Sequence, residues 1–141
     1  MEITSQLEAV GISGSPVVRR SMSGDSGACV RVVELDGERL VVVKTSPAVR
    51  NASNLDRSPP GGFTRIHEEA AGLSLIAATN TVAVPGILGC GVHAGTGILI
   101  LEHLVVARGP AEDDRAWIDF GRDLADLHLA EPRQTFVSGE R

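Results

Sequence analysis

The sequence A-C-V-R-V-V-E-L-D-G-E-R-L-V-V-V-K-T, residues 28–45, carries the strongest indication of the fold. Two valine-rich runs flank the dipeptide Asp36-Gly37. Valine loses little side-chain freedom in an extended strand, and an Asp-Gly pair readily adopts the left-handed backbone that a tight hairpin turn requires. The stretch therefore predicts two antiparallel strands, over residues 28–35 and 38–45, joined by that turn.

The second of these strands ends near Lys44, whose position raises a question of function. Successive side chains of a strand point to opposite faces, so Val42 and Lys44 share one face while Val41 and Val43 share the other. A lysine at the end of a strand usually extends its ammonium group into water. The alternative is that Lys44 reaches into a pocket that holds an anion, and the rest of the chain has to decide between the two.

Length and composition indicate one ordinary globular domain in the 141 residues. Hydrophobic residues make up 43% and aromatic residues only 3%, so the core is expected to consist of Val, Leu, Ile and Ala. The net charge of −5 argues against a nucleic acid or an anionic membrane as the main partner. The N-terminal sequence lacks the basic and apolar regions of a signal peptide, and no apolar run is long enough to span a membrane. We therefore expect a cytoplasmic location.

Further strands and a loop follow from local patterns. Residues 16–21, 87–93 and 97–104 each indicate a strand. Residues 46–62 contain three prolines and two glycines without any periodicity, which predicts a loop. Antiparallel hairpins in this order predict an α+β fold with a five-stranded antiparallel sheet and one packed helix, rather than a parallel βαβ fold.

Three helices are also expected. Thr4 or Ser5 can cap a short first helix that ends at Gly11. A second helix covers residues 63–79, and a third covers residues 114–130. Apolar residues recur along the second helix at helical steps: Ile66, Ala70, Leu73 and Ala77.

A glycine-rich loop precedes the hairpin. Its small residues, Gly24, Ser26 and Gly27, allow backbone N–H groups to approach a phosphate. Lys44 follows one hairpin later, and the second helix then brings two acidic residues. A glycine loop, a strand lysine for the nucleotide phosphates and a helical glutamate that holds this lysine are typical of the protein-kinase N-lobe. The order of these features therefore favours a nucleotide pocket at Lys44.

The phase of the second helix selects one of its two acids. With Ile66 facing the core and steps of about 100° per residue, Glu69 lies roughly 60° from the apolar stripe, and Glu68 lies near the opposite face. Glu69 is therefore expected to face the sheet, and Glu68 to face water. The strand I-L-I-L-E-H-L (98–104) would supply the adenine pocket. It would end in a hinge whose backbone binds the base: Glu102, His103 and Leu104.

Four stretches carry a resemblance to a known family. They are T-N-T-V-A-V-P (79–85), preceded by E-A-A-G-L (69–73), then I-L-I-L-E-H-L (98–104), and F-G-R-D-L-A-D-L-H-L (120–129). In these stretches the chain resembles the fructosamine kinase, or ketosamine-3-kinase, family, with the resemblance extending from about residue 14 to 130. The resemblance implies a protein-kinase-like fold. It also implies an enzyme family that uses ATP to phosphorylate the 3-hydroxyl of sugars attached to amines.

The same resemblance implies roles for individual residues. Lys44 would bind the ATP phosphates with Glu69 as its partner, Val42 would lie against adenine, and residues 102–104 would form the hinge. A nucleotide would then be the ligand of this chain. A glycated amine or protein would be a substrate only together with the second lobe of the kinase.

The resemblance also implies a division of the chain and a missing part. Residues 1–105 would form the N-lobe, residues 106–113 a linker, and residues 114–141 the first helix of a truncated C-lobe with its tail. In the family, the catalytic Asp and the Mg²⁺ ligands follow later in the chain, so we expect no catalytic or metal-binding residue here and no activity of the chain alone. Asp119-Phe120-Gly121 spells a kinase metal motif, but it falls within a helical pattern and has no catalytic loop before it.

Two other functions stay open. One is a non-enzymatic, kinase-fold domain that associates with a partner through its sheet or last helix. The other is a truncated kinase of the aminoglycoside phosphotransferase type, against which T-N-T-V-A-V-P argues.

The two cysteines, Cys29 and Cys90, are too few for a disulfide framework or a metal site. Cys29 follows the glycine loop and has three arginines nearby in sequence, and cationic surroundings favour the reactive thiolate form. The family resemblance further implies redox control at this position, through a disulfide between two subunits. We therefore expect a Cys29-linked homodimer on oxidation and an inert Cys90.

Overall fold

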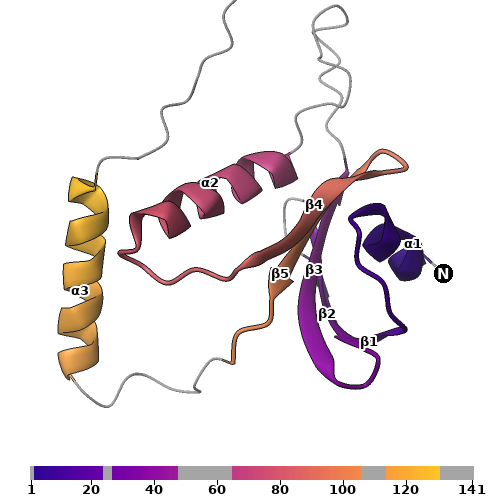
Figure 1. Cartoon of the computed structure of the whole chain (residues 1–141), viewed down its shortest axis with the longest axis horizontal. Coiled ribbons are helices and arrows are strands. Elements are labelled where there is room, and N and C mark those ends of the chain that lie inside the picture. Colours follow the sequence, from indigo (N-terminus) through magenta and orange to yellow (C-terminus); the bar gives the residue numbers. More distant parts are fainter. Residues whose placement is uncertain (1, 24–26, 48–64, 106–113, 131–141) are drawn as a thin grey trace, which may run out of the picture. The chain divides into compact units, whose positions relative to one another are not determined.

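The computed structural model describes residues 2–23, 27–47, 65–105 and 114–130. Figure 1 shows the elements in chain order: α1 (Glu2–Ala9), β1 (Pro16–Ser23), β2 (Cys29–Leu35), β3 (Arg39–Pro47), α2 (Arg65–Thr79), β4 (Ile87–His93), β5 (Thr96–Glu102) and α3 (Asp114–Leu129). The type and order of these elements are those predicted from the sequence.

The chain divides into two units. The first, Met1–Ala71 with Pro85–Leu104, contains α1, the whole sheet and the first half of α2. The second, Gly72–Val84 with Val105–Arg141, contains the end of α2, the loop after it, and α3. The expected linker at 106–113 lies outside the described residues, and the predicted lobe boundaries stay a prediction.

The five strands of the first unit form one antiparallel sheet in the order β1-β2-β3-β5-β4. This confirms the predicted α+β architecture. The order places β3, which carries Lys44, beside β5, which leads to the expected hinge. The sequence pattern predicted a strand over residues 97–104, but β5 ends at Glu102. His103 and Leu104 therefore follow the strand and are not part of it.

The Asp-Gly hairpin forms as predicted. Asp36 and Gly37 have φ values of 54° and 74°, and Glu38 N–H donates to the Leu35 carbonyl at 3.1 Å. Positive φ at both central residues matches the right-handed twist of the flanking strands, which explains why this turn fixes the pairing of β2 with β3.

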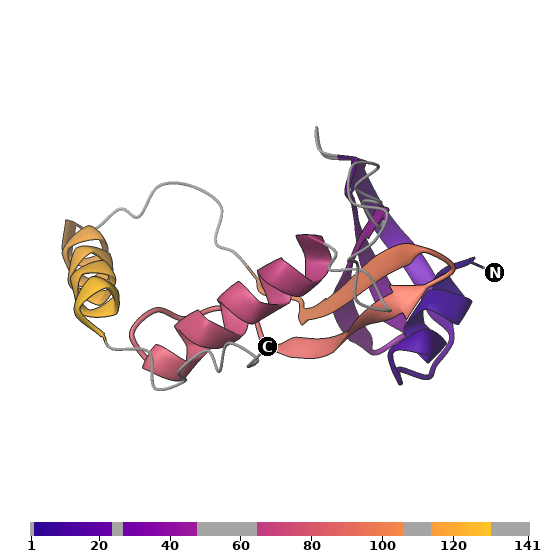
Figure 2. The same ribbon diagram turned by 90° about the horizontal axis from the view of Figure 1, so that it is seen from above.

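The main core lies between α1 and one face of the sheet. Leu7 of α1 is buried together with Val41 and Val43 of β3, while Lys44 on the other face stays half-buried. The first half of α2 lies on that other side of the sheet, and Figure 2 shows the same arrangement from above. The short N-terminal helix is therefore a core element in its own right, in addition to the one packed helix that the sequence predicted.

The start of α1 differs from the prediction, and its end agrees with it. The helix begins at Glu2, so Thr4 and Ser5 lie inside it and are not its cap. Gly11 has a φ of 81°, and the N–H of the next residue, Ile12, donates a hydrogen bond to the Leu7 carbonyl at 2.9 Å. A left-handed glycine of this kind is a common end of a helix.

The end of α2 explains part of the T-N-T motif. Thr79 Oγ1 donates to the Ile76 carbonyl at 2.6 Å and lies 2.8 Å from Thr81 Oγ1, while Asn80 has a φ of 53°. Asn tolerates the left-handed conformation better than most residues, and the Thr hydroxyl satisfies a carbonyl that the helix end leaves open. Burial of the apolar stripe decreases along α2: Ile66 near its start is buried, and Ala77 near its end is exposed.

Helix α3 contains no buried residue. Its aromatic side chains are largely exposed, Trp117 at 61% and Phe120 at 46%, and their rings meet edge to face. Asp119-Phe120-Gly121 lies within this helix, which agrees with the rejection of a kinase metal motif. Among the described helices, none is both long and apolar enough to cross a membrane.

Candidate functional site

Lys44 and Glu69 meet on the α2 side of the sheet. Lys44 Nζ lies 2.6 Å from Glu69 Oε2, and the two side chains are 27% and 36% exposed. Strand alternation turns Lys44 away from the core that α1 covers. The phase of α2 turns Glu69 toward Lys44, while Glu68 is exposed. The expected directions of all three side chains are therefore observed.

Apolar residues flank Lys44 on the two neighbouring strands. In the antiparallel register, Lys44 faces Val30 of β2 and Leu99 of β5, and residues directly opposite each other share one face of the sheet. One step along, Val42 faces Val32 and Leu101, so it lies beside Lys44 as expected. A cation at the edge of an apolar floor can bind a phosphate while the floor receives a flat base.

The expected hinge follows directly from this floor. Glu102 ends β5, His103 is half-buried and Leu104 is 51% exposed. Glu102 makes two hydrogen bonds with one residue, Gly86: its N–H donates to the Gly86 carbonyl at 2.9 Å, and its Oε2 accepts from the Gly86 N–H at 2.9 Å. Sequence reasoning missed Gly86, because no local pattern tells that the residue after Pro85 lies opposite Glu102.

The glycine loop is described only at its end. Gly27 is exposed, with a φ of 76°, and an added Cβ would have no neighbour within 4 Å. This conformation suits glycine, which has no side chain to strain it. Gly24 and Ser26 lie outside the described residues.

The two cysteines lie on opposite faces of the sheet. Cys29 faces Thr45, on the α1 side, and its Sγ lies 3.8 Å from Ser21 Oγ. Cys90 faces Leu99 and therefore lies in the same row as Lys44. Burial raises the pKa of the Cys90 thiol above its ordinary value, although part of the residue is exposed.

Two of the three arginines that the sequence places near Cys29 have partners of their own. Arg19 forms a two-point contact with Glu34, at 2.9 and 2.7 Å, and Arg31 donates to Gln6 Oε1 at 3.4 Å. Of these two, only Arg19 is thereby paired with an opposite charge. The proposed redox role of Cys29 stays a prediction.

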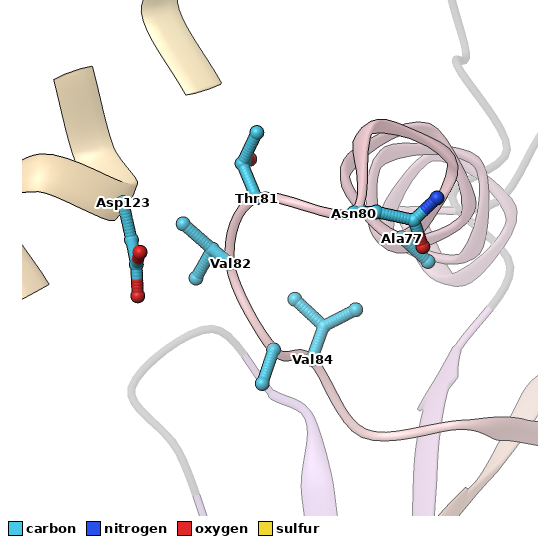
Figure 3. A pocket seen from close by; sticks show the side chains of 7 residues that line it. Ala77, Asn80, Thr81, Val82, Val84 and Asp123 are labelled. Carbon is cyan, nitrogen blue, oxygen red and sulfur yellow. The ribbon is translucent and has the colours of Figure 1, made fainter. Parts of the chain in front are cut away.

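A separate cavity of about 450 Å³ lies within the second unit. Figure 3 shows Val82 and Val84 of the loop after α2 on one side and Asp123 of α3 across from them. Small apolar residues line it together with three polar residues, Asn80, Thr81 and Asp123. No group of three His, Cys, Asp or Glu side chains that could hold a metal occurs here or elsewhere in the described part of the chain.

The donor set at Lys44 fits a nucleoside triphosphate. It offers one cation held by a carboxylate, an apolar floor beside it, and a strand end with peptide groups next to the floor. These are the chemical requirements for phosphates, a flat heterocycle and its hydrogen-bonding edge, respectively.

Comparisons with known proteins find similar chains. The chain is 34% identical over 115 residues to a curated protein of Synechocystis sp. named as a "Probable ketoamine kinase". It also superposes on the crystal structure of a "Putative fructosamine-3-kinase" from Haemophilus somnus 129PT, with a TM-score of 0.65 and 22% identity, over 92% of this chain. The chain spans 32% of the length of the curated relative and 39% of that solved chain.

The family model for fructosamine kinase matches residues 58–138, which is more than half of the chain. The matched region includes Glu69, the T-N-T-V-A-V-P loop and the strand that leads to Glu102. The chain belongs to the fructosamine kinase family.

Proposed function

We propose that this chain supplies the ATP-binding part of a kinase that phosphorylates ketosamines. The observation that carries the proposal is the contact of 2.6 Å between Lys44 Nζ and Glu69 Oε2 on the open face of the sheet. A lysine held in this way presents a fixed positive charge to the phosphates of a nucleotide. Family membership supports ketosamine phosphorylation as the reaction to which this charge contributes.

Each residue near the contact has a role in this proposal. Lys44 binds the ATP phosphates, and Glu69 holds the lysine in place. Val42 and Leu101, opposite each other in the register, provide the floor under adenine. The peptide groups of residues 102–104 bind the edge of the base, and the loop that contains Gly24, Ser26 and Gly27 covers the phosphates.

Phosphoryl transfer itself needs further groups. A base must orient the sugar hydroxyl, and Mg²⁺ ligands must hold the phosphates. We infer that these groups belong to the part of the family fold that the 141 residues do not span, since the chain covers 39% of the solved relative. The ketosamine substrate would bind there as well, and a cytoplasmic location remains a prediction from the sequence.

Titration with a fluorescent ATP analogue tests the proposal. Lys44→Ala should weaken binding about tenfold or more, because a hydrogen-bonded charge is lost. Arg39→Ala is the matched control, since it removes a positive charge from the exposed start of the same strand. Equal affinities for wild type and Lys44→Ala would contradict the assignment of this pocket.

A second candidate function is association with another polypeptide. It is favoured by α3, which has no buried residue and exposes Trp117, Ile118 and Phe120. Exposed apolar surface of this kind marks interaction sites in many proteins. The two functions are compatible, because the Lys44 contact belongs to the first unit and α3 to the second.

A further inference from the structure

The pairing of β1 with β2 contains a β-bulge. Val18 lies opposite Val33, whereas Arg20 lies opposite Val32. The strand therefore contains one extra residue, Arg19, without a register partner of its own on β2. An extra residue moves every later side chain of the strand to the face opposite the one that regular alternation would give. Bulges recur next to functional sites, where they change the direction of a side chain.

This bulge turns two consecutive arginines to the face of the sheet that carries Lys44. Arg19 donates two hydrogen bonds, of 2.9 and 2.7 Å, to Glu34, which lies on that face because both of its neighbours in β2 are buried in the core that α1 covers. Arg20 lies opposite Val32, two residues before Glu34, so it shares the same face. Arg19 is paired with a carboxylate, whereas Arg20 is exposed and forms no ion pair with the residues that the structure describes.

Arg20 lies at the end of the row of residues that contains the proposed floor for the base. Across the sheet, this row consists of Leu101 in β5, Val42 in β3, Val32 in β2 and Arg20 in β1. Lys44 belongs to the neighbouring row, which is closer to the glycine loop. Arg20 is therefore level with the base of the proposed nucleotide and not with its phosphates.

The chemistry of adenosine places the sugar near this end of the row. In the proposed orientation, the six-membered ring of adenine faces the end of β5, and the ribose is attached to the five-membered ring, on the other side of the base. Two spacings of about 4.8 Å separate β1 from β3, so a ligand that begins on Val42 meets the Arg20 side chain only if it extends across Val32. The ribose extends in this direction.

We propose that the Arg20 guanidinium binds the ribose hydroxyl oxygens of the nucleotide. A guanidinium group has N–H donors in a fixed planar arrangement, which suits two neighbouring oxygen acceptors. The proposal rests on the nucleotide-binding function above and adds a determinant for the sugar. It also gives the bulge a function, since regular alternation would turn Arg20 to the opposite face of the sheet.

Binding of ATP and of 2′,3′-dideoxy-ATP to the full chain tests the proposal, because the two nucleotides differ only in the ribose hydroxyl groups. Arg20→Ala should weaken ATP binding about three- to tenfold, the usual effect of one lost hydrogen bond, and leave dideoxy-ATP binding unchanged. Arg20→Lys keeps the charge without the planar donors and should retain only part of the preference for ATP. Arg39→Ala removes the same charge from the exposed start of β3 and should change neither affinity.

Two results with Arg20→Ala overturn the proposal. An equal loss for both nucleotides would mean that Arg20 acts through its charge on the phosphates, and an unchanged affinity for ATP would mean that it does not touch the nucleotide. The Arg20 Nε–H signal in NMR spectra of wild type provides a readout without substitution. It should shift more with ATP than with dideoxy-ATP, and equal shifts overturn the proposal.

The same titrations separate this proposal from the nucleotide-binding function. If Lys44→Ala weakens ATP binding and Arg20→Ala does not, only the ribose contact is contradicted. If wild type and Lys44→Ala bind ATP equally, the nucleotide site is wrong and the role of Arg20 is contradicted together with it.

Discussion

Glu68 and Glu69 are neighbours on α2 with different surroundings: Glu69 Oε2 lies 2.6 Å from Lys44 Nζ, whereas Glu68 is exposed. Glu69→Ala should therefore weaken binding of an ATP analogue several-fold, since Lys44 loses the group that holds it. The free energy of unfolding should change by about 1 kcal/mol or less, because an ion pair this accessible to water contributes little. Glu68→Ala removes the same charge one residue earlier and should leave binding unchanged. Equal losses in both variants would mean that net charge, and not the contact with Lys44, controls affinity.

Much of this site was predictable because its rules are local. Asp36-Gly37 specifies its own turn, strand alternation separates Lys44 from Val43, and helical phase separates Glu69 from Glu68. The role of Leu7 in the core and the bond between Gly86 and Glu102 were not predictable. Each depends on which distant segments the fold brings together, and neither changes the local sequence pattern.

The ion pair between Arg19 and Glu34 predicts a dependence of stability on pH. The Arg19 guanidinium, hydrogen-bonded to the carboxylate, holds the pKa of Glu34 below its ordinary value. A carboxyl group with a lowered folded-state pKa contributes stability above its unfolded pKa of about 4.3, and this contribution is lost as the pH falls through the folded-state value. The free energy of unfolding, measured with urea, should therefore fall less between pH 6 and acidic pH in Glu34→Gln than in wild type, because the variant has no carboxyl group to protonate at this position. Glu38→Gln, in the adjoining turn, should retain the wild-type slope.

The two thiols should differ in reactivity. Because burial raises the pKa of Cys90, its reaction with a thiol reagent should be slower at neutral pH than that of free cysteine and should increase at higher pH. The variant Cys29→Ser leaves Cys90 as the one thiol of the chain and allows this rate to be measured alone. Mild oxidation of wild type should give a covalent dimer through Cys29, which the same variant should abolish on a non-reducing gel. A dimer that persists in Cys29→Ser, or that needs Cys90, would contradict the prediction.

Helix α3 should cause the chain to associate. Trp117 is 61% exposed and Phe120 46% exposed, and burial of such surface between two chains is favourable. Light scattering should show self-association that Trp117→Ser with Phe120→Ser reduces. Asp126→Asn, an exposed polar change in the same helix, serves as the control. Because the chain has one tryptophan, its emission should shift to shorter wavelength as concentration rises. A monomer with constant emission over the accessible concentrations would contradict this prediction.

Two glycine substitutions should have opposite effects on stability. A Cβ at Gly89 would lie 3.0 Å from Val10 Cγ2 and 3.1 Å from the Val10 carbonyl, so Gly89→Ala should destabilise the chain by about 1–3 kcal/mol through overpacking. Gly72 lies in α2, and a Cβ there would have no neighbour within 4 Å, so Gly72→Ala should stabilise by about 0.5–1 kcal/mol. Chemical unfolding of both variants provides the measurement. A neutral Gly89→Ala would show that α1 can move away from β4 at little cost.

The strand order β1-β2-β3-β5-β4 has a consequence for the folding pathway. Three strand pairs join neighbouring segments: β1 with β2, β2 with β3, and β4 with β5. In contrast, β3 joins β5 only after the intervening chain, which includes α2, has been brought around. Contacts between distant segments form more slowly than local ones, because the loop between them has to close first. We therefore expect these three local strand pairs to appear early in refolding and the contact between Val43 and Ile100 to appear late. Lys44 and Leu99 lie opposite each other where β3 meets β5, so the proposed nucleotide site should be the last part of the sheet to form.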